Sequence, residues 1–193
     1  MMRAIERTAK RAGLPLSYSQ GFNPRPRLSL VCPRPVGVAT RDALLVVSLE
    51  AGQLDRQELE RRLNIAAPDG LRFLRSEPLQ TSRTPLPRTA RYELALEDAA
   101  VRRLRERLDR LTVADRWTVQ RRVFGDRRGG AQSREIDLRP LVGDVCVSEG
   151  RLRATLVRQG DLWARPGEVL ILLGLDGRRD LACVIRTQVE YEM

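Results

Sequence analysis

Residues 92–111 have the sequence YELALEDAAVRRLRERLDRL, and this stretch sets the architecture that we expect for the chain. Its first part, Tyr92–Leu96, predicts a strand, and its second part, Ala99–Leu111, predicts a helix. The apolar residues that share one face of this helix are Val101, Leu104, Leu108 and Leu111. A strand followed at once by a helix begins a β-α unit.

The segments that follow complete the unit, apart from a glycine- and arginine-rich loop at Asp126–Ser133. Pro166 favours the first turn of a helix, where its missing N–H costs nothing. The order is β-α-β…β-α-β, the pattern of a ferredoxin-like unit. We predict strands at Trp117–Phe124, Glu135–Leu138, Val145–Val147 and Leu152–Val157, a helix over Pro166–Leu173, and a closing strand over Ala182–Tyr191.

The residues before this unit predict a similar order with one strand fewer. Asp55 with Glu58 three residues later is typical of a capping box, which begins a helix. The predicted elements are a helix over 2–12, strands at Leu28–Val31 and Ala43–Leu49, the helix that Asp55 begins, and a strand that begins in Leu71–Leu74. We therefore predict an α+β protein of two ferredoxin-like halves, 1–80 and 91–193, with a linker at 81–90.

A ferredoxin-like half holds its first strand between the third and the fourth, and the first half lacks that strand. Its absence would leave the backbone groups of two strands unpaired. Either another segment fills the place or the natural protein begins upstream of Met1. We expect the second, with a gap between the strands near 44–49 and 71–77.

The composition excludes several classes of site. The chain has no histidine, which excludes Ser-His-Asp and Cys-His catalysis and every zinc site that needs imidazole. Its three cysteines, Cys32, Cys146 and Cys183, are far apart, and its one lysine, Lys10, follows no glycine loop. We therefore expect no bound metal, no Walker A motif and no cofactor.

The charge predicts an anionic partner. The formal net charge is +10, and residues 1–41 carry eight basic groups against one acid. Nucleic acid fits this cluster better than a membrane, because no strongly apolar amphipathic face accompanies it. No apolar run approaches the roughly 20 residues that cross a bilayer, and no secretory signal begins the chain. We expect a cytoplasmic protein without membrane contact.

The segment Gly21-Phe22-Asn23-Pro24-Arg25-Pro26-Arg27 is the most unusual in the chain. Its prolines favour an extended backbone, on which Arg25 and Arg27 project to one side. Phe22 beside them offers a stacking face, so the strip suits a phosphate backbone with an unstacked base. The alternative is a structural turn with solvated arginines and Phe22 in the core.

A second basic segment lies at 116–139, with seven arginines and three acids around Gly129-Gly130. Arginines beside flexible glycines can wrap phosphate, and the alternative is a mobile hairpin tip. The candidate contacts here are Arg121, Arg122, Arg127, Arg128 and Arg134, and we expect them near Arg25 and Arg27. Asp137 and Arg139 alternate with Ile136 and Leu138, which favours a structural ion pair at the junction of the halves.

Six blocks of the chain resemble the radical SAM-linked protein family, a bacterial domain of unknown function encoded beside or fused to radical SAM proteins. The blocks are Met2–Arg7, Arg11–Leu16, Ser19–Pro26, Pro35–Val38, Ile136–Pro140 and Arg165–Leu170. Many members of this family have histidine at the positions of Asn23 or Arg25, and a strand before the first helix; this chain has neither.

The resemblance implies a radical SAM partner and an RNA-modification setting, because the neighbouring enzymes resemble methylthiotransferases and tRNA-modifying enzymes. This chain lacks the Cys-x-x-x-Cys-x-x-Cys motif, so it is not itself the radical enzyme. We expect a non-catalytic accessory module that binds RNA, such as tRNA, or presents substrate. One alternative is a protein–protein adaptor without RNA contact. Another is an RNA-modifying enzyme that uses Asp42, Asp126 or Asp137, as pseudouridine synthases use one aspartate.

Overall fold

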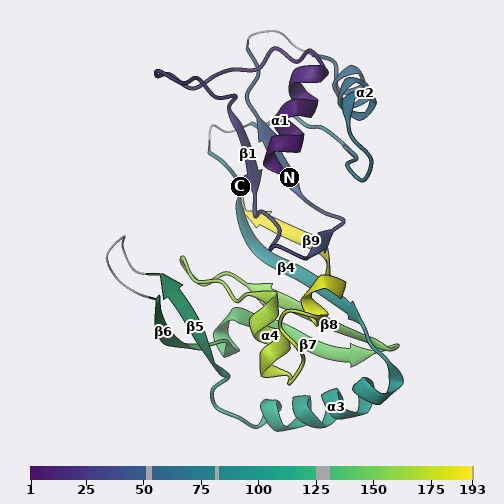
Figure 1. Ribbon diagram of the computed structural model, residues 1–193, viewed down its shortest axis with the longest axis vertical. Helices are drawn as coiled ribbons and strands as arrows, with labels where there is room; N and C mark the ends of the chain where they lie inside the picture. The colour runs from purple at the N-terminus through teal and green to yellow at the C-terminus, as the bar shows by residue number, and fades with distance from the viewer. Residues whose placement is uncertain (51–53, 81–82, 125–130, 193) are drawn as a thin grey trace. The chain divides into compact units, whose positions relative to one another are not determined.

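The computed structural model describes residues 1–50, 54–80, 83–124 and 131–192. They form a mixed α/β structure with four α-helices and three sheets among the described residues (Figure 1). The chain divides into two compact units. Unit 1 comprises Met1–Val31 and Leu44–Pro85, and unit 2 comprises Cys32–Ala43 and Leu86–Glu192. The segment Cys32–Ala43 therefore belongs to unit 2, although it lies between two parts of unit 1 in the sequence.

Unit 1 is built from two helices and a two-stranded antiparallel sheet. Its small apolar core joins Ala9, Leu14, Leu16 and Leu63. The predicted cap of the second helix is confirmed, because the carboxylate of Asp55 accepts a hydrogen bond from the backbone N–H of Glu58 at 3.2 Å. The elements are α1 (Met2–Arg11), β1 (Leu28–Val31), β3 (Leu44–Val47) and α2 (Arg56–Ala66).

The strand that we predicted to begin in Leu71–Leu74 is wrong. The backbone of this segment is bound by side chains of α2 instead of by a neighbouring strand. The Asn64 amide donates to the Phe73 carbonyl and accepts from its N–H, both at 2.9 Å. Glu60 Oε1 accepts from the N–H of Ser76 at 2.5 Å. Among the described residues, the sheet of unit 1 consequently contains only β1 and β3.

The hydroxyl of Thr8 offers a test of the packing of unit 1. Thr8 is fully buried on α1, and its Oγ1 has no hydrogen-bond partner among the described residues. A buried hydroxyl without a partner costs about 1–3 kcal/mol of desolvation. We expect Thr8→Val to slow hydrogen exchange of the α1 amides by a factor that corresponds to about 1 kcal/mol. Faster exchange than in the wild type would contradict this expectation.

Unit 2 contains a five-stranded sheet in the order β2-β9-β4-β8-β7 and a separate hairpin of β5 and β6 (Figure 1). All neighbouring strands are antiparallel except β2 and β9, which are parallel. The strands are β2 (Ala39–Thr40), β4 (Leu86–Ala95), β5 (Thr118–Phe124), β6 (Ala131–Asp137), β7 (Val142–Ser148), β8 (Arg151–Val157) and β9 (Ile185–Glu192). The helices are α3 (Asp98–Thr112) and α4 (Pro166–Leu172), with short 3-10 helices η1 (Arg139–Leu141) and η2 (Asp180–Cys183).

Both helices of unit 2 cover the same face of the sheet. Along β4 and β8, alternate residues are buried, because successive side chains of a strand point to opposite faces. The buried strand residues and the helices contribute to one core. That core includes Tyr92, Leu94, Leu152 and Leu156 from the sheet, Leu104 and Leu111 from α3, and Val169 and Leu170 from α4. The other face of the sheet is left for polar side chains.

Most elements of unit 2 lie where the sequence predicts them. The strand β4 is longer than predicted and begins at Leu86, within the segment 81–90 that we expected to be a linker. The two-residue strand β2 was not predicted. None of the described helices is both long and apolar enough to cross a membrane.

A buried arginine ties Cys32–Ala43 into unit 2. Arg186 on β9 is 0% exposed. Its guanidinium donates to the carbonyls of Cys32 at 2.6 Å and Asp42 at 3.0 Å, and to the hydroxyl of Thr40 at 3.2 Å. These acceptors are neutral groups. Burial also favours the neutral forms of the two titratable neighbours of Arg186: it raises the pKa of the Cys32 thiol, and it raises the pKa of Tyr92 to about 12. The cation is therefore held by dipoles of the segment that it anchors.

Candidate nucleic-acid interface

Residues 17–27 of unit 1 form a hairpin, which we call the tip hairpin. The N–H of Ser19 donates to the carbonyl of Arg25, and the N–H of Arg27 donates to the carbonyl of Ser17, both at 2.8 Å. Ser48 joins the hairpin to the rest of unit 1, because it accepts from Ser17 at 2.9 Å and donates to Arg27 at 3.0 Å. The segment is thus fixed by backbone hydrogen bonds, with a defined tip.

This ladder puts the two arginines on one face. Tyr18 and Pro26 are directly paired, so residues 25 and 27 lie on the opposite face from Pro26. Both arginines are exposed, and within the described parts of the chain neither guanidinium has a hydrogen-bond or ion-pair partner. Ser17 and Ser19 oppose them in the ladder. The face therefore presents guanidiniums and hydroxyls, which are common phosphate contacts.

The tip itself is fully exposed. Gly21 has φ of +131°, a value that favours glycine, and Phe22 after it is 102% exposed. Asn23 and Pro24 are also exposed, whereas Pro26 is half-buried in the ladder. The alternative that places Phe22 in the core is therefore wrong.

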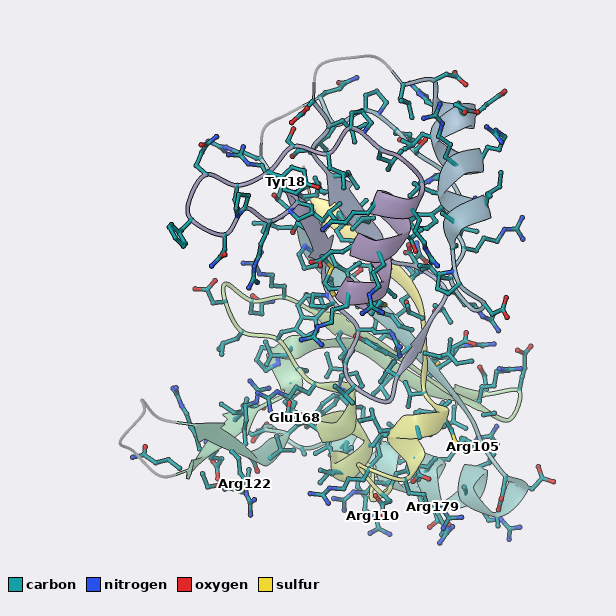
Figure 2. The ribbon with its side chains drawn as sticks, turned by 45° about the horizontal axis from the view of Figure 1, so that its top comes forward. Tyr18, Arg105, Arg110, Arg122, Glu168 and Arg179 are labelled. Carbon is teal, nitrogen blue, oxygen red and sulfur yellow. The ribbon has the colours of Figure 1, made fainter. Side chains whose placement is uncertain are left out.

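Aromatic exposure is concentrated on this hairpin. Among the residues whose side chains the structure describes, the exposed aromatics are Phe22 and Tyr18, which is 40% exposed (Figure 2). An exposed ring gains nothing from burial, so its position on the same hairpin as the two unpaired arginines is informative. A group that stacks on one of these rings would lie on the same hairpin as the guanidiniums of Arg25 and Arg27.

The helix α1 adds positive charge to unit 1. Arg3, Arg7 and Lys10 are exposed and recur at helical spacing, whereas Arg11 donates to the carbonyl of Ala66 at 2.7 Å. The carboxylate of Glu6 is the one acid in the first 31 residues. The first part of unit 1 thus keeps the positive character that the sequence indicated.

The structure corrects the expectation for Arg121. Its guanidinium is bound to both carboxylate oxygens of Glu168 at 2.6 Å and also donates to the carbonyl of Trp163 at 2.9 Å. The two charged side chains are only 11% and 10% exposed. The Arg121 guanidinium is bound to Glu168 inside unit 2 and is therefore not free to contact a phosphate. Breaking the pair would leave a buried charge without its counter-ion.

The other arginines of that segment have different positions. Arg122 on β5 and Arg134 on β6 are exposed. Arg127, Arg128 and Asp126 lie outside the described residues. Arg25 and Arg27 belong to unit 1, whereas these arginines belong to unit 2. That the two groups lie near each other stays a prediction.

Asp137 and Arg139 do not bind each other through their side chains. The Asp137 carboxylate accepts from the backbone N–H of Trp117 at 2.9 Å and of Arg139 at 3.0 Å. Its ion-pair partner is Arg116, at 3.6 Å, while the Arg139 guanidinium donates to the carbonyl of Ala114. The hydrogen bond from Trp117 is the main cause that lowers the pKa of Asp137. The expected ion pair between Asp137 and Arg139 is therefore wrong: each side chain has a structural role, but with a different partner.

The aspartates offered for catalysis serve backbone groups where they are described. Asp42 Oδ2 accepts from the N–H of Val189 at 2.7 Å, and Asp137 is occupied as above. Across the described ranges, no three Cys, Asp or Glu side chains gather in a way that could hold a metal ion. Both carboxylates thus hold backbone groups of unit 2 in place.

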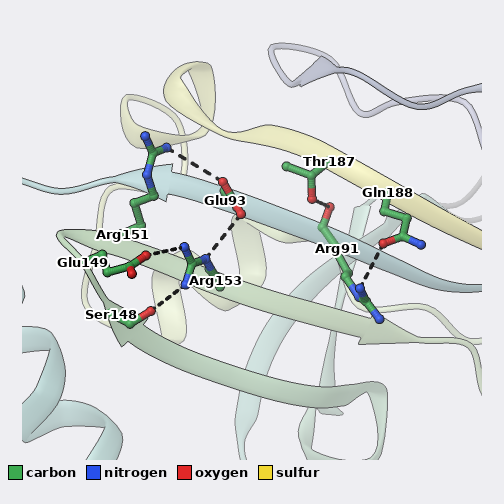
Figure 3. Close-up of polar contacts among 8 residues, drawn as sticks. All are labelled: Arg91, Glu93, Ser148, Glu149, Arg151, Arg153, Thr187 and Gln188. Atoms are coloured by element: carbon green, nitrogen blue, oxygen red, sulfur yellow. Dashed lines mark hydrogen bonds and ion pairs between the residues drawn. The ribbon is translucent and has the colours of Figure 1, made fainter.

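The polar face of the sheet in unit 2 is not a comparable basic surface. Arg153 donates to Glu93 at 3.4 Å, to Ser148 at 2.7 Å and to Glu149 at 2.9 Å (Figure 3). Arg91 likewise binds Gln188 and Glu190, at 2.9 and 3.1 Å (Figure 3 shows the first of these). Because these guanidiniums are paired with carboxylates, this face attracts a polyanion less than the tip hairpin does.

Sequence reasoning singled out Gly21–Arg27 as an extended strip, but it did not predict the tip hairpin and it missed Tyr18 as the second exposed ring. The signal was available, since Tyr18 is one of only three tyrosines and lies four residues before Phe22.

Comparison with known proteins gives one match: the model of a family described as an uncharacterized protein conserved in bacteria (DUF2344) matches residues 1–166. No curated protein and no solved structure matches the chain.

Proposed function

We propose that this chain, which belongs to that bacterial family (DUF2344), is a non-catalytic accessory protein that binds RNA through the tip hairpin. One observation carries the proposal: the exposed aromatics of the described residues and two unpaired arginines share this one hairpin. Stacking on a ring tolerates any base, whereas guanidiniums bind phosphate. The hairpin therefore suits a single-stranded or looped region of RNA.

The resemblance to the radical SAM-linked family supports a radical SAM enzyme as the partner. In this proposal the accessory protein holds an RNA, such as a tRNA, while the enzyme modifies it. The absence of a Cys-x-x-x-Cys-x-x-Cys motif from the sequence agrees with a division of labour between two proteins.

We also infer that unit 2 is ferredoxin-like. Its elements β4, α3, β7, β8, α4 and β9 follow one another as β-α-β-β-α-β, apart from the inserted hairpin of β5 and β6. The first strand of this order, β4, lies between β9 and β8, which is the central place that such a unit requires. For unit 1 the support is weaker, since its described sheet has two strands.

Fluorescence anisotropy with a labelled single-stranded RNA tests the function. We expect Phe22→Ala to weaken binding between about fivefold and a hundredfold, because stacking contributes about 1–3 kcal/mol per base. Ile65→Ala is the matched control, since Ile65 is an exposed apolar residue of the same unit, 72% exposed. This control should bind as the wild type does.

The arginines have a separate signature in the salt dependence of binding. We expect Arg25→Ala with Arg27→Ala to reduce the slope of log K against log salt concentration by about 1.4, because each phosphate of a single strand that is no longer neutralised removes about 0.7 from the slope. The control removes the same charge from the exposed Arg72 and Arg75 of unit 1 and should keep the slope. RNA binding that is unchanged in all of these variants, or absent at physiological salt, would refute the proposal.

A different feature favours the adaptor hypothesis as a second candidate function. Unit 2 has a groove lined by exposed aliphatic side chains and arginines. An adaptor would bind its protein partner with no affinity for RNA, and that binding would survive in the tip-hairpin variants.

A further inference from the structure

A groove opens on unit 2 beside the start of α4. Its volume is about 360 Å³. Three parts of unit 2 contribute to its wall: the segment that holds Val36, the strand β5 with Arg122, and α4 with the turn that follows it. None of these residues belongs to the tip hairpin, so the groove needs an explanation of its own.

One side of the groove is aliphatic and exposed to water. Val36 is 96% exposed and Ile171 is 60% exposed, and the half-buried Leu181 lies in the same lining. Ile171 is on the outer side of α4, whose neighbours Leu170 and Leu172 are buried in the core. Exposed apolar side chains from separate segments that line one groove are typical of a binding site.

Two glycines of the groove lining, Gly167 and Gly177, pack closely against each other. A Cβ atom added to Gly177 would lie 2.8 Å from Cγ1 of Ile171 and 3.1 Å from the carbonyl oxygen of Gly167. A Cβ atom on Gly167 would lie 3.2 Å from the carbonyl oxygen of Gly177. A Cβ atom at either position would collide with its neighbours, so the two glycines let the start of α4 and the turn at Gly177 pack closely together beside the groove.

Positively charged side chains also line the groove. Arg122 and Arg165 are exposed. Among the described lining residues the one carboxylate is that of Glu168, and both of its oxygens are bound by Arg121 at 2.6 Å. Arg165 lies 4.0 Å from this carboxylate, with its side chain 64% exposed. The two rim arginines therefore retain positive charge that a ligand can neutralise.

We propose that this groove docks an acidic segment of a partner protein. One aliphatic side chain of that segment packs against Val36 and Ile171, and its carboxylates bind Arg122 and Arg165. Charge complementarity selects the acids, because guanidiniums bind carboxylates in a bidentate manner. No aromatic ring is among the described residues that line the groove, so this part of the lining offers no stacking platform of the kind that a nucleic acid uses. The proposal does not depend on RNA binding by the tip hairpin.

Selection of a displayed peptide library on the intact protein tests this proposal. The peptides are random and about 12 residues long, because an extended chain of that length spans a groove of this kind. We expect the selected peptides to combine Asp or Glu with Leu, Ile or Val. Val36→Asp and Arg122→Glu should each weaken binding of a selected peptide by about tenfold or more, which corresponds to about 1.4 kcal/mol, because each places a negative charge against the acidic peptide. Arg105→Glu is the matched control, because Arg105 is an exposed arginine on α3 rather than on β5 (Figure 2). It should leave the affinity unchanged.

The amide resonances of residues 36 and 171 should shift when the selected peptide is added to labelled protein. The tryptophans of unit 2 verify that each variant is folded. Failure to select any acidic peptide would overturn the proposal, as would peptides that bind both variants as tightly as the wild type. A single-stranded RNA that displaces the peptide, and whose own binding falls in the two groove variants, would assign the groove to nucleic acid instead. Normal RNA binding by the groove variants with loss of peptide binding would support two separate sites.

Discussion

Replacement of Arg186 by methionine is expected to lower the free energy of unfolding of unit 2 by at least about 3 kcal/mol. Arg186 is fully buried, and its removal deletes three hydrogen bonds from a charged donor, to the carbonyls of Cys32 and Asp42 and to the hydroxyl of Thr40. A hydrogen bond that involves a charged group contributes about 1.5–3 kcal/mol. Denaturation followed by tryptophan fluorescence measures the effect.

The fluorescence reports unit 2 alone, because Trp117 and Trp163 both pack in its core and the chain has two tryptophans. Gln188→Ala on the same strand is the control, since Gln188 is exposed and should cost less than about 0.5 kcal/mol. If Arg186→Met does not fold, Thr40→Val removes one acceptor and should cost about 1 kcal/mol. An unfolding midpoint of Arg186→Met equal to that of the wild type would show that the segment is held by other contacts.

Replacement of Glu168 by alanine is expected to cost about 3–5 kcal/mol, because it leaves the Arg121 guanidinium buried without its counter-ion. Glu168 also accepts from the backbone N–H of Arg165 at 2.9 Å, so the start of α4 loses a hydrogen bond too. The same fluorescence measurement applies. Addition of Arg121→Met should restore part of the lost stability, since a buried charge is then no longer unpaired.

Exposed ion pairs of the same unit provide the control. Arg153 and Glu93 are 40% and 27% exposed, and replacement of Glu93 by glutamine should cost less than about 1 kcal/mol. If Glu168→Ala and Glu93→Gln lower the free energy of unfolding equally, the ion pair of Arg121 and Glu168 is no stronger than an exposed one. That result would contradict its description as a buried pair. If the double variant is less stable than Glu168→Ala alone, Arg121 contributes mainly through its hydrogen bond to Trp163.

Much of the local structure could be predicted because its causes are local. The helix that Asp55 begins depends on a capping residue and on apolar spacing within one segment. The extended form of Arg25–Arg27 likewise follows from its prolines, and the structure fixes it in the ladder of the tip hairpin. The exposure of Phe22 was only one of two alternatives, since an apolar ring in a loop is as compatible with a core as with a binding surface.

The failures have a different cause. The segment 71–76 has the composition of a strand, but the side chains of Asn64 and Glu60 on α2 form hydrogen bonds with its backbone groups. These bonds take the place of the hydrogen bonds that a neighbouring strand would make. The sequence holds 34 arginines, and nothing in their local sequence distinguishes buried arginines from exposed ones. Arg121 was therefore grouped with the exposed Arg122. Only the approach of Glu168, 47 positions away, distinguishes the two.

By itself the sequence determined the mixed α/β class, the limits of most helices and strands, and the basic character of residues 1–31, since each depends on the spacing or charge of neighbouring residues. Tertiary structure alone decided that Cys32–Ala43 belongs to unit 2 and which arginines stay free to bind a ligand. Both outcomes depend on partners distant in sequence, as Arg186 is from Cys32. The physical reason is that the free energy of a buried charge depends on the groups that surround it after folding, and local patterns of residues do not encode that environment.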